Sequence, residues 1–123
     1  MLYLGIVLAG GTGALLRYSL GRLVFNLQWS ALPFGTLLAN IIGCFLIGYL
    51  SWSLVHRWHV SEQMQVIIIT GFLGGFTTFS AFSLEAVSMF EQGANLRSLI
   101  YIAVNVFFCI TMTVLGLALA RQT

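Results

Sequence analysis

Four long apolar segments make up nearly the whole of this 123-residue chain and constrain its fold more than any other feature. They run from Leu2 to Phe25, from Pro33 to Val55, from Glu62 to Phe90 and from Leu96 to Ala120, joined by short polar connectors. A helix needs about 20 apolar residues to span a hydrocarbon core of about 30 Å. We therefore predict four transmembrane helices that form a single domain over residues 1–123.

The composition agrees with a protein whose solvent is lipid. Hydrophobic residues make up 59% of the chain and charged residues only 7%, against roughly a quarter charged in soluble domains. The apolar segments are continuous runs rather than alternations of apolar and polar residues, so the chain is predicted to be all-α and not a β-barrel. Its five arginines are scattered singly, which argues against a nucleic-acid partner.

Polar residues recur every four positions in two of the spans, so each set lies on one helical face. One interpretation is helix packing, because small and hydroxyl residues commonly join membrane helices. The other is a polar lining that faces the protein interior or a partner. The two stripes are Thr36, Asn40, Cys44 and Gly48 in the second span, and Tyr101, Asn105, Cys109 and Thr113 in the fourth.

The third span carries the most informative motif, GFLGGFTTFSAFS, from Gly71 to Ser83. Gly74 and Gly75 followed by Thr77 and Thr78 make a poor continuous helix. The motif therefore predicts a helix broken near the bilayer midplane. Unwound backbone at that depth is tolerated only where it is buried in protein or lines a cavity, so the break predicts a functional site.

The residues after the break favour an anion. Phe79 and Phe82 share one helical face, with Thr77, Ser80 and Ser83 in an adjacent row. Phenyl rings carry positive edges, and hydroxyl and amide donors beside them suit a small anion that loses its water. For the two phenylalanines alone, packing or contact with lipid is the alternative.

Several other residues each have two interpretations. Arg17, which follows a glycine-rich run in the first span, either snorkels to the interface or attracts anions at an aqueous vestibule. Cys44 and Cys109 lack the spacing of a metal site or a disulfide framework and are predicted to be packing residues. His56 and His59 form either an interfacial turn or a pH sensor.

The arginines outside the span centres divide evenly between the two sides of the membrane. Arg57 and Arg121 lie on the side of both termini, and Arg22 and Arg97 lie on the other. The positive-inside rule therefore gives no preferred orientation. We infer that the chain inserts both ways round and assembles as an antiparallel dimer.

Four segments together resemble the Fluc (CrcB) family of fluoride channels: GGTGALLR, GTLLANIIGCFLIG, TGFLGGFTTFSAFSLE and TMTVLGLA. The resemblance covers essentially the whole chain. It implies an antiparallel, dual-topology homodimer in the bacterial inner membrane, with two fluoride pores and a central structural sodium ion. It also implies passive conduction that expels fluoride from the cytoplasm and confers resistance to it.

The resemblance also assigns roles to individual residues. Sodium would be held by the backbone carbonyls of Gly74 and Thr77, and Arg17 would lie at the vestibule. The residues assigned to the pore are Asn40, Phe79 and Phe82, with Ser80, Ser83 and Thr113 as a polar track. Glu85 receives no role beyond a pairing with an arginine near the membrane surface, and a pore contact by Asn105 stays open.

Three other classes of protein fit the sequence less well. A proton-coupled multidrug exporter needs a carboxylate in the membrane, usually in its first helix, and Glu85 in the third span is the only candidate here. A noncatalytic membrane subunit would explain the stripes as packing but not the break. An enzyme is disfavoured because the sequence has no catalytic triad, metal cluster or phosphate loop.

Overall fold

The structure, a computed structural model, describes residues 1–26 and 32–123. This part of the chain is helical outside its turns and contains no strand. Four segments in it are long and apolar enough to cross a membrane, namely Leu2–Phe25, Phe34–Arg57, Glu62–Glu91 and Asn95–Gln122. The prediction of an all-α protein with four spans is therefore confirmed.

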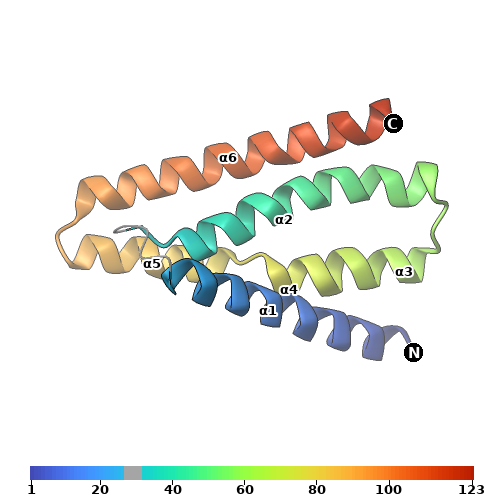
Figure 1. Cartoon of the computed structure of the whole chain (residues 1–123), viewed down its shortest axis with the longest axis horizontal. Helices are drawn as coiled ribbons and strands as arrows, with labels where there is room; N and C mark the ends of the chain where they lie inside the picture. The colour runs from blue at the N-terminus through green and yellow to red at the C-terminus, as the bar shows by residue number, and fades with distance from the viewer. Residues whose placement is uncertain (27–31) are drawn as a thin grey trace.

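Figure 1 shows the four spans side by side, with both termini at the same end, as an even number of passes requires. The first and last spans are single helices, whereas the second ends in a π-helical turn and the third is divided into several pieces. The elements are α1 (Leu2–Asn26), α2 (Phe34–Trp52), η1 (Ser53–Arg57), α3 (Glu62–Val66), η2 (Ile67–Leu73), α4 (Gly74–Phe76), α5 (Phe79–Glu91) and α6 (Asn95–Gln122).

The backbones of α2 and α6 meet at glycines. A Cβ atom at Gly48 of α2 would overlap the carbonyl oxygen of Thr113, and one at Gly116 of α6 would overlap that of Phe45. Small residues permit such close approach between membrane helices. This contact places the two polar stripes of α2 and α6 opposite each other.

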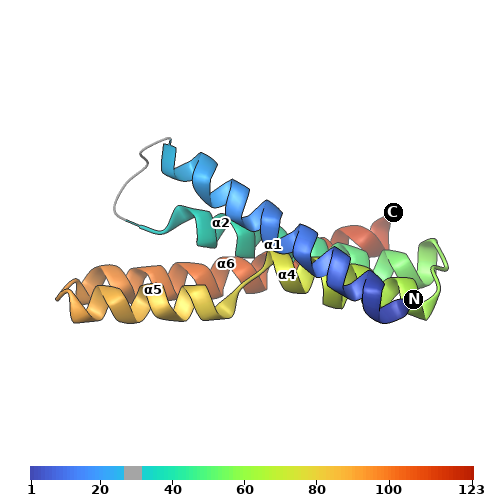
Figure 2. The same ribbon diagram turned by 90° about the horizontal axis from the view of Figure 1, so that it is seen from below.

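The main core cluster joins α2, α5 and α6. Its buried members are Leu37, Phe82, Ala86, Met89 and Tyr101. In Figure 2, α5 lies along α6 while the C-terminal half of α1 diverges from it. Phe79, the first residue of α5, has a side chain that is 76% exposed.

The third span is broken at Thr77 and Thr78, which are both extended (φ −83°, ψ 158° and φ −154°, ψ 118°). The glycine pair does not belong to the break, contrary to the prediction, because Gly74 and Gly75 form the helical turn α4. Gly75 instead permits close packing on α1, since a Cβ atom there would overlap the carbonyl of Gly10. The break therefore depends on the two threonines.

Candidate functional site

Asn40 of α2 holds the broken backbone in place. Its Oδ1 accepts a hydrogen bond from the amide of Thr78 at 2.8 Å, and its Nδ2 donates to the carbonyl of Thr78 at 3.0 Å. The Thr78 hydroxyl in turn accepts from the amide of Ala81 at 3.2 Å and caps α5. Because Asn40 is only 7% exposed, these bonds satisfy buried backbone groups that the break removes from the helical pattern.

A cavity of about 300 Å³ opens beside the break. Residues of α2, of the break and α5, and of α6 line it together, and none of them is charged. The lining residues are Asn40, Cys44, Thr77, Thr78, Phe79, Phe82, Asn105, Val106, Cys109 and Ile110.

Phe79 and Phe82 both line this cavity and meet edge to face, with ring centroids 5.3 Å apart and an interplanar angle of 60°. Their surroundings differ. Phe82 is 6% exposed and packs against the ring of Tyr101 at 5.4 Å, whereas Phe79 is 76% exposed. The structure thus fixes one ring in the core and leaves the other at the mouth of the cavity.

The two polar stripes face each other level by level. Asn40 Nδ2 donates to Asn105 Oδ1 at 3.5 Å, and one helical turn further on Cys44 and Cys109 both line the cavity. Asn105 is 4% exposed, and its Nδ2 has no hydrogen-bond partner among the described residues. The polar stripes of α2 and α6 therefore meet and form one continuous polar strip along the cavity.

Glu85 of α5 lies at the end of this strip. Its two carboxylate oxygens accept short hydrogen bonds from the hydroxyls of Thr36 at 2.7 Å and Tyr101 at 2.6 Å. No arginine forms an ion pair with Glu85 within residues 1–26 and 32–123, so the expected arginine pairing is absent there. Two hydroxyls hold this carboxylate instead, and they are the first members of the two stripes.

The predicted polar track is not gathered at the cavity. Ser80 lies 3.2 Å from the Thr78 hydroxyl, and Ser83 donates to the carbonyl of Phe79 at 2.9 Å. Thr113 donates to the carbonyl of Cys109 at 3.0 Å, one turn beyond the lining. In the single chain each of these hydroxyls has a hydrogen-bond partner in its own span. That they contact an ion stays a prediction.

Arg17 of α1 reaches the other side of the break. Its Nε donates to the carbonyl of Gly75 at 3.3 Å, and its side chain is half-buried. Gly75 lies in the last turn before the break, where unsatisfied carbonyls carry partial negative charge. Snorkelling to the interface does not account for this contact, which ties α1 to the broken span.

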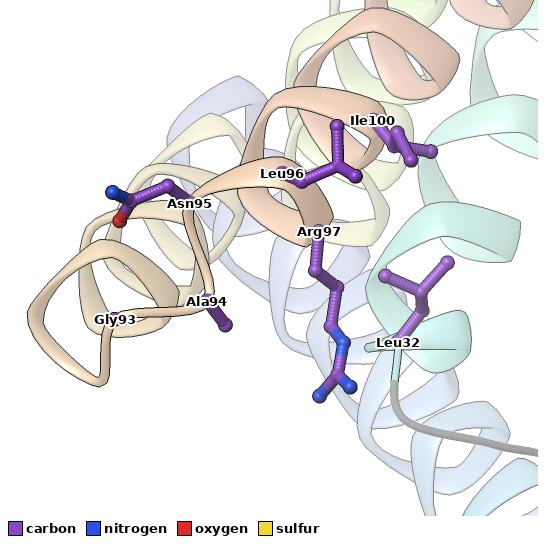
Figure 3. A pocket seen from close by; sticks show the side chains of 7 residues that line it. All are labelled: Leu32, Gly93, Ala94, Asn95, Leu96, Arg97 and Ile100. Carbon is purple, nitrogen blue, oxygen red and sulfur yellow. The ribbon is translucent and has the colours of Figure 1, made fainter.

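A second pocket, of about 490 Å³, lies at the turn between α5 and α6 (Figure 3). It contains one charged side chain, Arg97, and none of the predicted site residues. Its lining consists of Leu32, Gly93, Ala94, Asn95, Leu96, Arg97 and Ile100. The candidate site is therefore the cavity at the break.

Comparison with known proteins matches residues 4–117 to the family described as CrcB-like protein, Camphor Resistance (CrcB). The chain belongs to the CrcB family. A relative from Rhizobium etli (strain CIAT 652) is 44% identical over 116 residues, which cover 94% of this chain and 93% of the relative. A relative from Agrobacterium fabrum is 43% identical over 123 residues, which cover 99% and 98%. Both are named fluoride-specific ion channel FluC.

Membership of the CrcB family places the four apolar spans in a membrane. The chain is a multi-pass protein of the inner membrane. Its relatives are ion channels, and this CrcB protein is likewise not an enzyme. The resemblance drawn from the sequence motifs is confirmed by these matches.

The backbone at the break fits a cation held by carbonyl oxygens. In a continuous helix the Gly74 carbonyl would bind the amide of Thr78, but that amide donates to Asn40 at 2.8 Å. The Thr77 carbonyl would bind the amide of Ala81, which donates to the Thr78 hydroxyl at 3.2 Å. Carbonyls that lose their helical donors in this way are suitable ligands for Na⁺.

Proposed function

We propose that this protein is a fluoride-selective passive ion channel. The observation that carries the proposal is the break at Thr77 and Thr78, which Asn40 holds open beside a cavity lined by Phe79 and Phe82. Relatives that match almost the full chain are named fluoride-specific ion channels, which supports the same ion.

The lining suits fluoride because it offers positive character without a charged group. The side chains of Asn40, Asn105 and two phenylalanines line the cavity, and no carboxylate does. Phenyl rings carry positive edges. In a narrow path, such donors replace the hydration shell of a small anion. A larger halide gains less from the same short contacts, which supports selectivity for fluoride over chloride.

The working unit that we propose is an antiparallel homodimer of dual topology. Phe79 is 76% exposed in the single chain, so a second copy packed there would complete the lining. Arg57 and Arg121 lie at one end of the bundle and Arg22 and Arg97 at the other, which supports insertion in both orientations. Reporters fused to the C-terminus should then give signal from both sides of the membrane, and strong signal from only one side would contradict this assembly.

A structural sodium ion at the centre of this dimer completes the proposal. Gly74 is exposed in the single chain, and the amides that would bind the carbonyls of Gly74 and Thr77 are engaged elsewhere. Two copies would together supply four such carbonyls. The ion would join the two broken spans without any acidic side chain.

The direction of transport follows from the membrane potential. Hydrogen fluoride enters a cell as a neutral molecule and dissociates in the less acidic cytoplasm. A potential of about 100 mV, negative inside, contributes about 2.3 kcal/mol per charge and supports a roughly 50-fold gradient of an anion. Passive conduction therefore exports fluoride.

A growth assay tests this role. The gene is expressed in a bacterial strain that lacks its own fluoride exporter, beside a matched Asn40→Asp variant whose carboxylate would repel the anion. We expect the unaltered protein to restore growth in fluoride and the variant to fail. If the unaltered protein is present in the membrane and the strain still fails to grow in fluoride, the result would contradict the proposed function.

A further inference from the structure

The two cysteines of this chain lie together on neighbouring helices. Cys44 of α2 and Cys109 of α6 both line the cavity at the break. They lie at the same level of the two helices, between the contact of Asn40 with Asn105 and that of Gly48 with Thr113. Both are free and only partly buried, and the sequence contains no other cysteine. The spacing of the two cysteines does not reveal this pairing, because it depends on the register of α2 against α6.

We propose that Cys44 and Cys109 form a binding site for a soft metal cation of the Hg²⁺ type, and that a metal bound there closes the cavity. Metal binding by the two thiols does not depend on the proposed function. The closure part rests on the proposed function as a fluoride channel.

The chemistry of the pair suits such a cation. Thiolates are soft ligands that select soft metals over Mg²⁺ or Ca²⁺, and Hg²⁺ prefers two sulfur ligands in a line. Binding forms two sulfur–metal bonds, and the two thiols release their two protons to water. No oxidant or reductant is needed, since neither sulfur nor metal changes its oxidation state.

The surroundings of the thiols are also built for a ligand. Cys109 Sγ donates to Asn105 Oδ1 at 3.4 Å, while Asn105 Nδ2 is buried without a partner among the described residues. An unpartnered buried amide is costly, so the polar groups at this level are not all satisfied in the single chain. A metal bridge here would lie one turn from Asn40, directly in the path assigned to the anion.

Thiol protection tests the binding part. Purified protein in detergent, free of reductant, is treated with one equivalent of HgCl₂ per chain, and the thiols that still react with iodoacetamide are counted by mass spectrometry. We expect both thiols to be protected and glutathione to leave the metal in place. In Cys44→Ser, glutathione should remove the metal. Protection of only one thiol by one equivalent of Hg²⁺ would overturn the two-thiol site.

Fluoride efflux from liposomes tests the closure part. We expect Hg²⁺ to stop efflux through the unaltered protein and dimercaptopropanol to restore it. The double variant Cys44→Ser/Cys109→Ser, compared with its own rate before metal, should not respond. Continued efflux from a protein with both thiols protected would overturn closure. An absence of efflux before any metal is added would instead contradict the proposed function and leave the thiol result standing.

Discussion

The side-chain amide of Asn40 binds both backbone polar groups of Thr78, accepting from its N–H at 2.8 Å and donating to its C=O at 3.0 Å. A side chain of α2 thus replaces the helical hydrogen bonds that the third span loses at its break. Buried backbone groups require such partners. The break is therefore a fixed part of the fold. Asn40 stabilises the break and, like Thr78, lines the cavity.

Replacing Asn40 with leucine should damage stability and conduction together. The N–H and C=O of Thr78, which is half-buried, would lose their partners, at up to about 1–3 kcal/mol for each group. We expect a lower melting temperature in detergent and no fluoride efflux. Asn40→Asp keeps the acceptor for the Thr78 amide, so it should melt closer to the unaltered protein while conducting no anion. Normal efflux in either variant would remove Asn40 from the pathway.

The edge of the Phe82 ring should contribute directly to conduction. Phe82→Ile keeps an apolar side chain in the core but removes the aromatic ring that meets Phe79 at 5.3 Å. We expect fluoride efflux to slow at least tenfold, equivalent to about 1.4 kcal/mol in the barrier. Phe107→Ile is the matched control, because Phe107 is 65% exposed and lies outside the cavity lining. Equal rates for the two variants would contradict a specific role for the ring.

The hydroxyls of Thr36 and Tyr101 should stabilise the protein through Glu85. Thr36→Val and Tyr101→Phe each remove one hydrogen bond to the carboxylate, and bonds to charged groups contribute about 1.5–3 kcal/mol. We expect each variant to lower the melting temperature. In a Glu85→Gln background both substitutions should have a smaller effect, because the shared charged acceptor is gone. Unchanged effects in that background would show that the two hydroxyls act independently of Glu85.

Sodium should stabilise the purified protein. An ion that binds the folded dimer through the carbonyls of Gly74 and Thr77, and not the unfolded chain, raises the melting temperature with its concentration. We expect replacement of Na⁺ by the bulky cation N-methylglucamine, at equal ionic strength, to lower the melting temperature and favour dissociation. A melting temperature independent of Na⁺ would contradict the structural ion.

The sequence predicted the number of spans and the region of the break for clear physical reasons. The spans follow from the length of each apolar run, and the break follows from adjacent β-branched residues, Thr77 and Thr78, deep in one of them. The prediction that the glycine pair belongs to the break was wrong. Gly74 and Gly75 remain helical, and Gly75 is explained by the close approach of α1 at Gly10, a contact that no local pattern reveals.

The partners of the polar residues depend on helix register, which the sequence does not contain. The four-residue spacing indicated that Asn40 and Asn105 each lie in a stripe, but only the packing of α2 on α6 shows that the stripes meet. The same packing explains why Glu85 is held by Thr36 and Tyr101 rather than by an arginine. The available signal in the sequence was one charged residue, Glu85, in a span between two polar stripes that each begin with a hydroxyl side chain.

We propose that copies of this chain, without any other protein, form a path for fluoride. Purified protein is reconstituted into liposomes loaded with potassium fluoride or potassium chloride, and efflux after addition of valinomycin is followed with an ion-selective electrode for each anion. We expect rapid fluoride efflux and almost no chloride efflux, with neither seen in protein-free liposomes. Comparable efflux of both anions, or of neither, would contradict it.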